Sequence, residues 1–399
     1  MKNIRILSLF AAIVMILSCL GCNSELPEET TEKIENIENT ESPESGTEGT
    51  ELPESTEPEV TEPPFPIYEG PSSEFKFTAE SVLPSVSYIT YTDFIRKADK
   101  SYLVPALAGK MIPQGMDIWE ERGWLLISGY FPSTDISDCS ILVAVDMNTG
   151  AYVGEYYLTN MDGTPHSSHA GGVAVTDKNV YIANGSKLYR VPLTELLKAG
   201  QCGKITIADE ISVPVRASFC NYSGGYLWVG DFQYSTSHTT DEYRHMTNRE
   251  GKKYYAWTVG YELDESTENG LKAEAMVKDS FATPDVIFSM TERIQGFAAT
   301  ENTVALSQSY GRTNKSTIFL YENPIGDKAH KTAELNGKSV PVYFLDSKVP
   351  SVSVTAPPMS EGLAVADGDL YILFESAADK YANGGGKDPT ENVWKMPID

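Results

Sequence analysis

The amino-acid sequence predicts an all-β fold, a five-bladed β-propeller whose ring is closed by a strand from the N-terminal side of the domain. Three observations predict it. A phrase made of a glycine, an apolar run, a polar turn and a second apolar run recurs along the chain. A third apolar stretch follows every copy, and a fourth follows all but the last. Few segments have helical character, the best being the short stretch 193–200.

The N-terminus has the pattern of an export signal. Lys2 and Arg5 precede an apolar run that ends at Cys22 and is too short to span a bilayer. With Leu20 and Gly21 before Cys22, the stretch resembles the lipobox of bacterial lipoproteins, a family in which this cysteine is lipidated after cleavage. The resemblance implies a protein attached by lipid to the extracellular face of the bacterial membrane.

Two alternatives to this N-terminal assignment stay open. Cys19 competes with Cys22 as the lipid acceptor. The other alternative is a plain cleaved signal without lipid.

Residues 23–66 differ in composition from the rest of the chain. They contain fourteen Glu and one Lys, with no aromatic residue before Phe65, and Pro, Ser and Thr fill most gaps. Such a segment cannot bury enough apolar area to offset the entropy cost of ordering it, so we expect a disordered acidic tether. The folded domain is predicted to span 67–399.

Charge limits the classes of partner. Of the total net charge of −25, the tether carries −13 and the signal +2, which leaves −14 for residues 67–399. A nucleic acid partner is disfavoured, because phosphate binding needs clustered Lys and Arg. Beyond the signal the cysteines are Cys139, Cys202 and Cys220. A Cys202–Cys220 bridge and isolated buried thiols both fit this spacing.

The repeated phrase predicts hairpins. Four copies begin at Gly115, Gly172, Gly296 and Gly362, and a degraded fifth has Ser218 in the glycine position. The Asp, Asn and Gly residues between the two apolar runs favour the backbone angles of a tight turn. The irregular spacing of the copies is compatible with blades that carry loop insertions.

The remaining strands of each blade follow from the apolar stretches after the hairpins. Third strands are predicted at 140–147, 186–193, 256–263, 316–323 and 392–399. Fourth strands are predicted at 151–158, 204–211, 273–280 and 340–347. The last copy lacks a fourth strand, so we expect 75–83 to supply it, because closed rings hide their edges in this way. Six blades are the alternative if 84–112 or 266–292 holds another copy, and a pair of β-sandwiches is a third option.

The hairpin phrases carry a resemblance to known proteins. "EGLAV…LYILFES" and "GGVAV…VYIAN" resemble the blade openings of NHL-like and gluconolactonase-like propellers, and of secreted bacterial propellers without assigned activity. In gluconolactonase-like proteins the glutamate of an "EG" opening ligates a divalent metal, with Asn and Asp from other blades. The resemblance therefore implies Glu361 as a ligand of Ca²⁺ or another divalent cation.

Candidate ligand-binding residues lie just before the motif glycines, because first strands line the axis of a propeller. These are Gln114, Gln295 and Glu361, with His169 and Arg293 slightly earlier in their copies. A structural role in holding the blade openings in register is the alternative for the same side chains.

Other polar groups are weaker candidates for the site. Tyr310 and Arg312 can bind a carboxylate or stack on a sugar. His166 with His169 suggests a metal pair, but this stretch is predicted as a loop, which gives no helical spacing. Glu375 with Asp231 forms a conceivable carboxylate pair for glycoside hydrolysis. The insertion 233–254, rich in Tyr and His, is expected to be a long hairpin that can form one wall of a binding face.

The function that best fits these features is binding of an extracellular protein or glycan through the channel face by a lipid-anchored propeller. The second hypothesis is an extracellular metal-dependent lactonase, hydrolase or polysaccharide lyase that uses Glu361. A purely structural role in the cell envelope is the third. The chain contains no GxSxG, HExxH or phosphate-cradling glycine loop, so serine hydrolases, zinc proteases and nucleotide enzymes are disfavoured.

Overall fold

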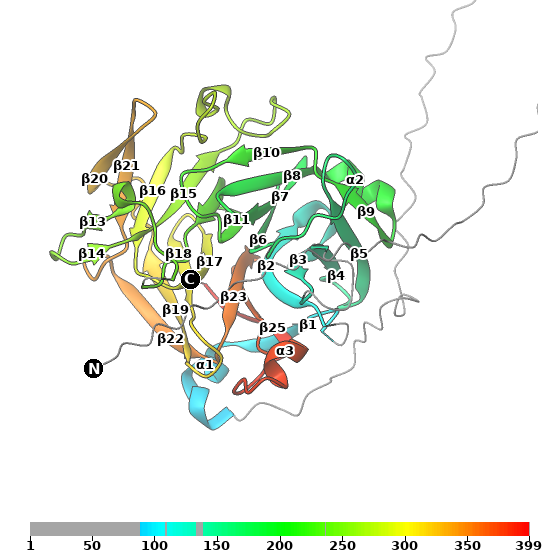
Figure 1. The fold of residues 1–399 in the computed structure, drawn as a ribbon. Coiled ribbons are helices and arrows are strands. Elements are labelled where there is room, and N and C mark those ends of the chain that lie inside the picture. The colour runs from blue at the N-terminus through cyan, green and yellow to red at the C-terminus, as the bar shows by residue number, and fades with distance from the viewer. Residues whose placement is uncertain (1–87, 108–109, 133–138, 236, 399) are drawn as a thin grey trace, which may run out of the picture. The chain divides into compact units, whose positions relative to one another are not determined.

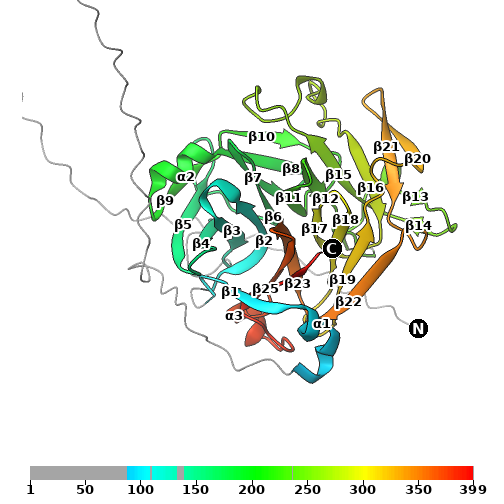
Figure 2. The same cartoon turned by 180° about the vertical axis from the view of Figure 1, so that it is seen from behind.

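Five sheets, each built on four antiparallel strands, surround one axis and form a β-propeller (Figures 1 and 2). The computed structural model describes residues 88–107, 110–132, 139–235 and 237–398. The predicted fold class is confirmed, with five blades and not six. The predicted signal peptide and acidic tether lie outside the described residues. Within the described residues no helix is both long and apolar enough to cross a membrane.

Each blade has an inner strand next to the axis and three further strands outward. Blade 1 consists of β2 (Ile112–Trp119), β3 (Trp124–Tyr130), β4 (Ile141–Asp146) and β5 (Tyr152–Thr159). Blade 2 consists of β6 (Gly172–Val175), β7 (Asn179–Asn184), β8 (Lys187–Pro192) and β10 (Asp209–Ser212). Blade 3 consists of β11 (Phe219–Ser223), β12 (Tyr226–Gly230), β15 (Ala256–Glu262) and β16 (Val286–Met290). Blade 4 consists of β17 (Ile294–Ala299), β18 (Thr303–Gln308), β19 (Ser316–Glu322) and β22 (Ser351–Ala356). Blade 5 consists of β23 (Ser360–Ala366), β24 (Asp369–Phe374), β25 (Asn392–Pro397) and β1 (Asp99–Leu103).

Short helical segments lie between the strands. The predicted helix is present as α2 (Leu193–Ala199). The others are η1 (Tyr88–Tyr91), α1 (Thr92–Lys97), η2 (Glu120–Arg122), η3 (Glu242–Arg244), η4 (Ala273–Ala275) and α3 (Asp379–Ala382). The predicted insertion 233–254 contains η3 and the small hairpin of β13 (Met246–Thr247) and β14 (Lys253–Tyr254).

The ring is closed by β1, but the closing strand is not the predicted one. β1 pairs antiparallel with β25, with Lys100 opposite Trp394. The helix α1 just before it packs Phe94 against Trp394, with ring centroids 5.2 Å apart. The strand expected at 75–83 lies outside the described residues, and 99–103 takes the edge position that it was expected to fill. A strand from the N-terminal side therefore completes blade 5.

Three of the four predicted fourth strands are wrong in detail. The stretch 204–211 is divided between β9 (Cys202–Thr206) and β10, and only β10 belongs to blade 2. The stretch 273–280 holds η4 instead of a strand, and β16 completes blade 3. The stretch 340–347 overlaps β21 (Lys338–Phe344), which pairs with blade 3, and β22 completes blade 4.

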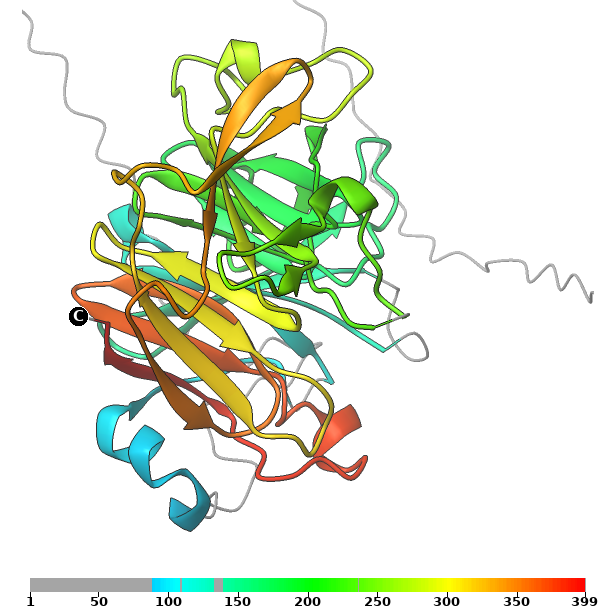
Figure 3. The same ribbon diagram turned by 90° about the vertical axis from the view of Figure 1, so that its left-hand side faces the viewer.

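Two blades borrow a further outer strand from the next blade along the chain. β9 runs parallel to β5 and extends blade 1, and β21 runs parallel to β16 and extends blade 3. β20 (Lys331–Leu335) pairs with β21, and this hairpin lies at the outer side of blade 3 (Figure 3). Parallel pairing satisfies backbone groups that an open edge would expose. Because β9 and β21 pair with a preceding blade, the apolar composition of an outer strand does not predict which blade it joins.

The core lies between neighbouring blades. Trp228 of blade 3 contacts Phe288 of the same blade at 5.4 Å and Phe297 of blade 4 at 4.8 Å between ring centroids. All three side chains are at most 1% exposed. Because each blade is covered on both faces, its middle strands are apolar at nearly every position, unlike strands of a half-exposed sheet.

The motif glycines meet at the axis. A Cβ built on Gly115 would lie 2.4 Å from the Cα of Gly172, and one built on Gly362 would lie 2.8 Å from the Cα of Gly115. A Cβ on Gly296 would lie 2.4 Å from the carbonyl oxygen of Glu361. The inner strands therefore pack backbone against backbone around a single centre, which confirms the predicted common axis. The phrase is repeated because a side chain at this position would force the blades apart.

A buried acid joins the inner strands farther along the axis. Asp117 of β2 is 3% exposed, and its carboxylate accepts hydrogen bonds from the backbone N–H groups of Val175 at 2.8 Å and Tyr222 at 3.0 Å. It also accepts from the Nδ2 of Asn221 at 3.1 Å and from its neighbour Ile118 at 2.9 Å. One side chain thus satisfies polar groups of three blades in a place that water does not reach.

Candidate ligand-binding site

Three inner strands begin with a β-bulge, and each bulge contains a predicted site residue. The pairing register jumps between Pro113 and Gly115, between Ile294 and Gly296, and between Ser360 and Leu363. The bulged residues in blades 1, 4 and 5 are Gln114, Gln295 and Glu361 with Gly362. A bulge leaves one residue outside the ladder and turns its side chain in a new direction. At these positions it allows polar groups beside the axis while the glycines keep the inner strands in contact.

A cavity of about 470 Å³ lies at the start face, which we define as the end of the axis where the inner strands begin. Gln114, Gln295 and Glu375 line it with polar groups, and Tyr130, Phe232 and Tyr381 line it with aromatic rings. His169, His238 and Arg216 complete the charged and titratable lining. Concave sites of this size with a few convergent polar groups are the usual form of small-ligand sites.

Two glutamates are in contact in this site. Glu361 and Glu375 are 3% and 9% exposed, and their carboxyl groups are hydrogen bonded to each other. The Nε2 of Gln295 donates to Glu361 Oε1 at 3.0 Å, and the Nε2 of Gln114 donates to Glu375 Oε2 at 2.9 Å. Two adjacent carboxylates cannot both be ionised at low cost, so the pair shares a proton and titrates as a unit.

The pKa values of both carboxyl groups are raised. Burial, and then repulsion from Glu375, raises the pKa of Glu361 well above its usual range. Burial raises the pKa of Glu375 to about 7, against the opposing effect of its hydrogen bonds with Gln114 and Tyr381. Near neutral pH the pair therefore keeps at least one proton and can both accept and donate hydrogen bonds.

This pair should make stability depend on pH. The pKa of Glu375 is higher in the folded protein than the ordinary value of 4.5. Its contribution to stability is therefore present below pH 4.5 and is lost as pH rises through about 7. Between pH 5 and pH 8, the free energy of unfolding of Glu375→Gln should improve relative to wild type by roughly 3 kcal/mol. Urea unfolding of both proteins across this range measures the difference, and parallel pH profiles would contradict the shared-proton assignment.

Aromatic rings form the walls above these acids. Burial raises the pKa of Tyr130 to about 12, against the opposing effect of the neighbouring Tyr381 hydroxyl group, so the phenol of Tyr130 stays protonated. The ring of His169 lies 4.6 Å from that of Tyr130. Burial lowers the pKa of His169, with the charges of Lys380 and His238 adding to the effect, so the imidazole is neutral near pH 7. The walls thus combine flat apolar surfaces with neutral donors and acceptors.

The predicted site residues divide into three groups. Gln114, His169 and Gln295 line the cavity. Glu361 is nearly inaccessible and acts through its contacts with Glu375 and Gln295. Three others lie outside the lining: Arg293, Tyr310 and Arg312.

The residues outside the lining make contacts of their own. The guanidinium of Arg293 lies 5.0 Å from the ring centre of Tyr234 and 5.4 Å from that of Tyr310, and it pairs with Glu292 at 2.8 Å. Arg312 lies 5.1 Å from the ring centre of Tyr381, which does line the cavity. Arg312 is therefore next to the site, whereas Arg293 and Tyr310 form a separate stack with Tyr234.

Sequence reasoning missed the aromatic lining. Tyr130 ends β3, the strand that pairs with the inner strand of blade 1, and Glu375 directly follows the corresponding strand β24 of blade 5. Because second strands run antiparallel to inner strands, their last residues return to the start face. That rule could have found Tyr130, but Tyr381 comes from α3, which no periodicity indicated.

The conceivable pairing of Asp231 with Glu375 is not formed. Asp231 is fully buried, and its carboxylate accepts the backbone N–H groups of Arg216 at 2.7 Å and Trp257 at 3.1 Å. The guanidinium of Arg244 lies 3.6 Å away. Asp231 therefore connects segments of blade 3 and is not part of the cavity lining.

The candidate metal ligands among the described residues do not form a cation site. Among the described residues, no group of three or more His, Cys, Asp and Glu side chains converges in a way that could hold a metal ion. Glu361 contacts one other acid and an amide, which is fewer ligands than Ca²⁺ takes from proteins. His166 and His169 do not act as a metal pair. His166 Nδ1 is hydrogen bonded to Asn160 Oδ1 at 2.8 Å, and the ring of His166 packs against that of Tyr189.

The three cysteines of the described residues form no disulfide with one another. Cys139 and Cys220 are buried, and the exposed Cys202 donates a hydrogen bond to Glu155 Oε1 at 3.2 Å. The conceivable Cys202–Cys220 bridge is therefore not formed, because these residues belong to strands of different blades, β9 at the edge of blade 1 and β11 at the axis.

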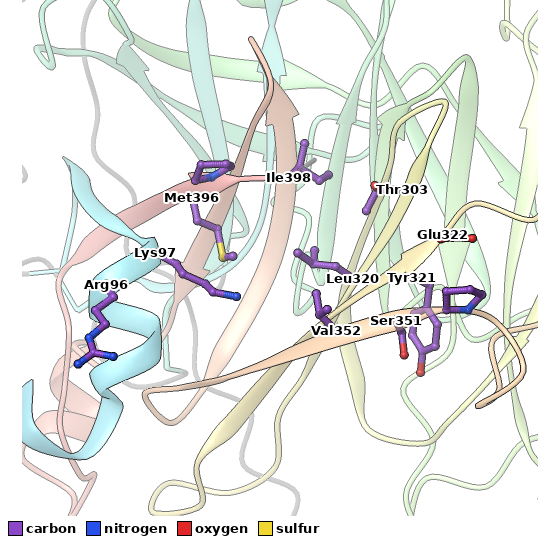
Figure 4. Close-up of a pocket in the computed structure, with 12 residues that line it drawn as sticks. Arg96, Lys97, Thr303, Leu320, Tyr321, Glu322, Ser351, Val352, Met396 and Ile398 are labelled. Carbon is purple, nitrogen blue, oxygen red and sulfur yellow. The ribbon is translucent and has the colours of Figure 1, made fainter.

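A second cavity lies away from the axis. It has a volume of about 710 Å³ and lies beside β22 and α1 (Figure 4). Leu320, Val352, Met396 and Ile398 give it an apolar lining, with Lys97 at one side. It lacks a convergent set of polar groups, so the cavity at the start face is the stronger candidate for recognition of a ligand.

Comparisons with known proteins do not assign this chain to a family. No protein-family model matches the chain, and no curated protein matches its sequence. Solved structures that resemble it include the glutaminyl cyclase of Myxococcus xanthus, with 10% identity over 76% of this chain and 96% of that one at a TM-score of 0.36. A GH43_1 enzyme from Xanthomonas citri has 10% identity over 77% of this chain and 92% of that one at 0.41. BamB from Moraxella catarrhalis has 10% identity over 82% of this chain and 95% of that one at 0.28. These sequence identities and TM-scores are too low to assign a family. The protein class is therefore the one that the strand topology defines, a β-propeller.

Proposed function

We propose that this protein is a lipid-anchored propeller of the bacterial cell surface that binds an extracellular glycan in the cavity at the start face. The observation that carries the proposal is the set of three bulges, which bring Gln114, Gln295 and Glu361 to one end of the axis. The proposed anchor is Cys22, and the acidic segment 23–66 would hold the propeller away from the membrane.

The chemistry of the cavity suits sugars. We call the group of Gln114, Gln295, Glu361 and Glu375 the floor of the cavity. Sugar hydroxyl groups both donate and accept hydrogen bonds, and the amides and the carboxyl pair of the floor do the same. Tyr130, Phe232 and Tyr381 add flat surfaces on which the apolar face of a sugar ring can stack. A protein partner would need a broad exposed contact area, and these aromatic groups are gathered in a concavity instead.

Glycan binding can be tested by screening the full-length protein against an array of neutral and acidic glycans, followed by calorimetry with the best ligand. We expect Gln114→Ala and Gln295→Ala each to weaken binding about tenfold, because each removes a side chain that lines the cavity. Asn302→Ala is the matched control, since this exposed amide lies in the turn at the far end of β17 and should leave affinity unchanged. Retention of full affinity in both Gln variants would refute the location of the site.

Hydrolysis of the bound glycan is a second candidate, favoured by the raised pKa of Glu375. A carboxyl group that is protonated near neutral pH can donate a proton to a leaving group. Glycosidases separate their two carboxyl groups by roughly 5 to 10 Å, whereas Glu361 and Glu375 are in contact, so Glu361 would not be the second catalytic group. Release of reducing ends from the bound glycan, abolished in Glu375→Gln, would support catalysis.

A further inference from the structure

Cationic side chains surround the cavity at the start face. Arg216 lines it from the loop before β11, Lys380 lies in α3, and Arg312 lies in the loop between β18 and β19. All three are exposed. They come from segments of blades 3, 4 and 5, so the propeller brings together charges that are far apart in the sequence.

Within the described residues no ion pair joins these cations to an acid, although the charges of Arg216 and Lys380 act on the buried Asp231 and Glu375. The Nη1 of Arg216 donates to the carbonyl oxygen of Thr239 at 3.0 Å, and the Nη1 of Arg312 donates to that of Gly384 at 2.9 Å. Lys380 lies over two aromatic rings. By contrast Arg190 and Arg249, elsewhere on the propeller, pair with Asp209 and Asp346. We call the rim of the cavity that carries Arg216, Arg312 and Lys380 the mouth. In a protein with a net charge of −25, these three cations are available to an anion.

Two of the cations lie over the faces of rings proposed to hold a sugar. The Nζ of Lys380 is 5.8 Å from the ring centre of Tyr130 and 5.3 Å from that of Tyr381. The guanidinium of Arg312 is 5.1 Å from the ring centre of Tyr381. A sugar ring on these tyrosines would place its substituents within reach of both charges.

The floor of the cavity carries acidic side chains instead. The Glu361 and Glu375 pair repels an anionic group once Glu375 is ionised, and it accepts hydrogen bonds from hydroxyl groups. A ligand that carries both kinds of group would be oriented by this arrangement, with its hydroxyl groups toward the floor and its anionic group toward the mouth.

The space available is larger than one sugar. A further cavity of about 600 Å³ shares Tyr130 and His169 with the first and is also lined by Lys380. Two cavities with a common wall can hold successive residues of a chain. The charge of Lys380 then lies in the lining of the second position.

We propose that the ligand is an acidic oligosaccharide whose uronic acid carboxylates bind Lys380, Arg312 and Arg216 while its hydroxyl groups bind the acidic floor. This inference rests on the proposed function and narrows it to one class of glycan. A guanidinium forms two parallel hydrogen bonds with a carboxylate, which explains why arginine suits this role at the mouth.

The test compares each acid with its own neutral ester. Calorimetry with the full-length protein uses oligosaccharides of galacturonate, mannuronate and glucuronate, each as the free acid and as the methyl ester. We expect at least one acid to bind about tenfold more tightly than its ester, with the preference reduced in high salt. Lys380→Ala and Arg312→Ala should each weaken acid binding about fivefold and leave ester binding unchanged.

The control is Lys331→Ala, which removes the same charge from the exposed residue that begins β20. If Lys331→Ala weakens acid binding as much as the variants of the mouth, net charge explains the effect and the proposed site is wrong. Equal binding of acids and esters would overturn this inference and leave glycan binding intact. Binding of neutral glycans alone on the array would have the same meaning, and an array without any retained glycan would overturn the proposed function itself.

Discussion

Replacing Gly172 by alanine is expected to prevent formation of the native ring. The new Cβ would lie 2.1 Å from the backbone nitrogen of Cys220 and 2.9 Å from the Cα of Phe219. These are backbone atoms of the neighbouring inner strand, so no rotation of a side chain can relieve the overlap. Either the strands separate or the blade tilts, and both break the packing between blades. We expect a loss of at least about 4 kcal/mol in the free energy of unfolding.

The matched control for this variant is Gly163→Ala. Gly163 has a positive φ of 81°, and a Cβ there would meet no atom within 4 Å. Its substitution costs only backbone strain, about 1 kcal/mol. Urea unfolding followed by tryptophan fluorescence compares the two. A Gly172→Ala protein as stable as Gly163→Ala would show that the blades do not meet at this glycine.

Asp117→Ala is expected to have the second largest effect. The substitution leaves the backbone N–H groups of Val175, Tyr222 and Ile118 without an acceptor in the buried centre of the ring. An unsatisfied buried donor costs about 1 to 3 kcal/mol, so for three donors we expect a loss of at least about 3 kcal/mol in the free energy of unfolding. The cost should be large because the three donors belong to different blades and cannot all find one new partner.

The control for Asp117→Ala is Asp177→Ala, which removes an exposed acid close to the same end of the axis. Its effect should be below about 0.5 kcal/mol. Thermal unfolding monitored by circular dichroism measures both variants. Similar melting temperatures for the two would mean that the carboxylate of Asp117 is dispensable for joining the inner strands.

The recurring hairpins were predictable because four of the five blades meet the same steric requirement at the axis. Gly115, Gly172, Gly296 and Gly362 lie where a Cβ cannot fit, so the repeat is visible in the sequence. The outer strands were not predictable in the same way. The stretch 204–206 is as apolar as a fourth strand of blade 2, yet it pairs with blade 1. That choice depends on which open edge lies nearest in space, which local composition does not encode.

The candidate site was predictable in part for the same reason. Gln114, Gln295 and Glu361 precede the motif glycines, and position in the repeat was enough to locate them. The contact between Glu361 and Glu375 depends on a bulge, and the approach of Lys380 to Tyr130 depends on how α3 folds back toward blade 1. These details arise from loops whose paths carry no periodic signal.

The most direct test of this account is a crystal structure of the full-length protein with the oligosaccharide that binds it most tightly. The account predicts the sugar at the start face of the axis, with hydroxyl groups within hydrogen-bond distance of Gln114, Gln295 or Glu375 and a ring against Tyr130 or Tyr381. A ligand held in the cavity beside β22, or on the outer strands, would contradict it.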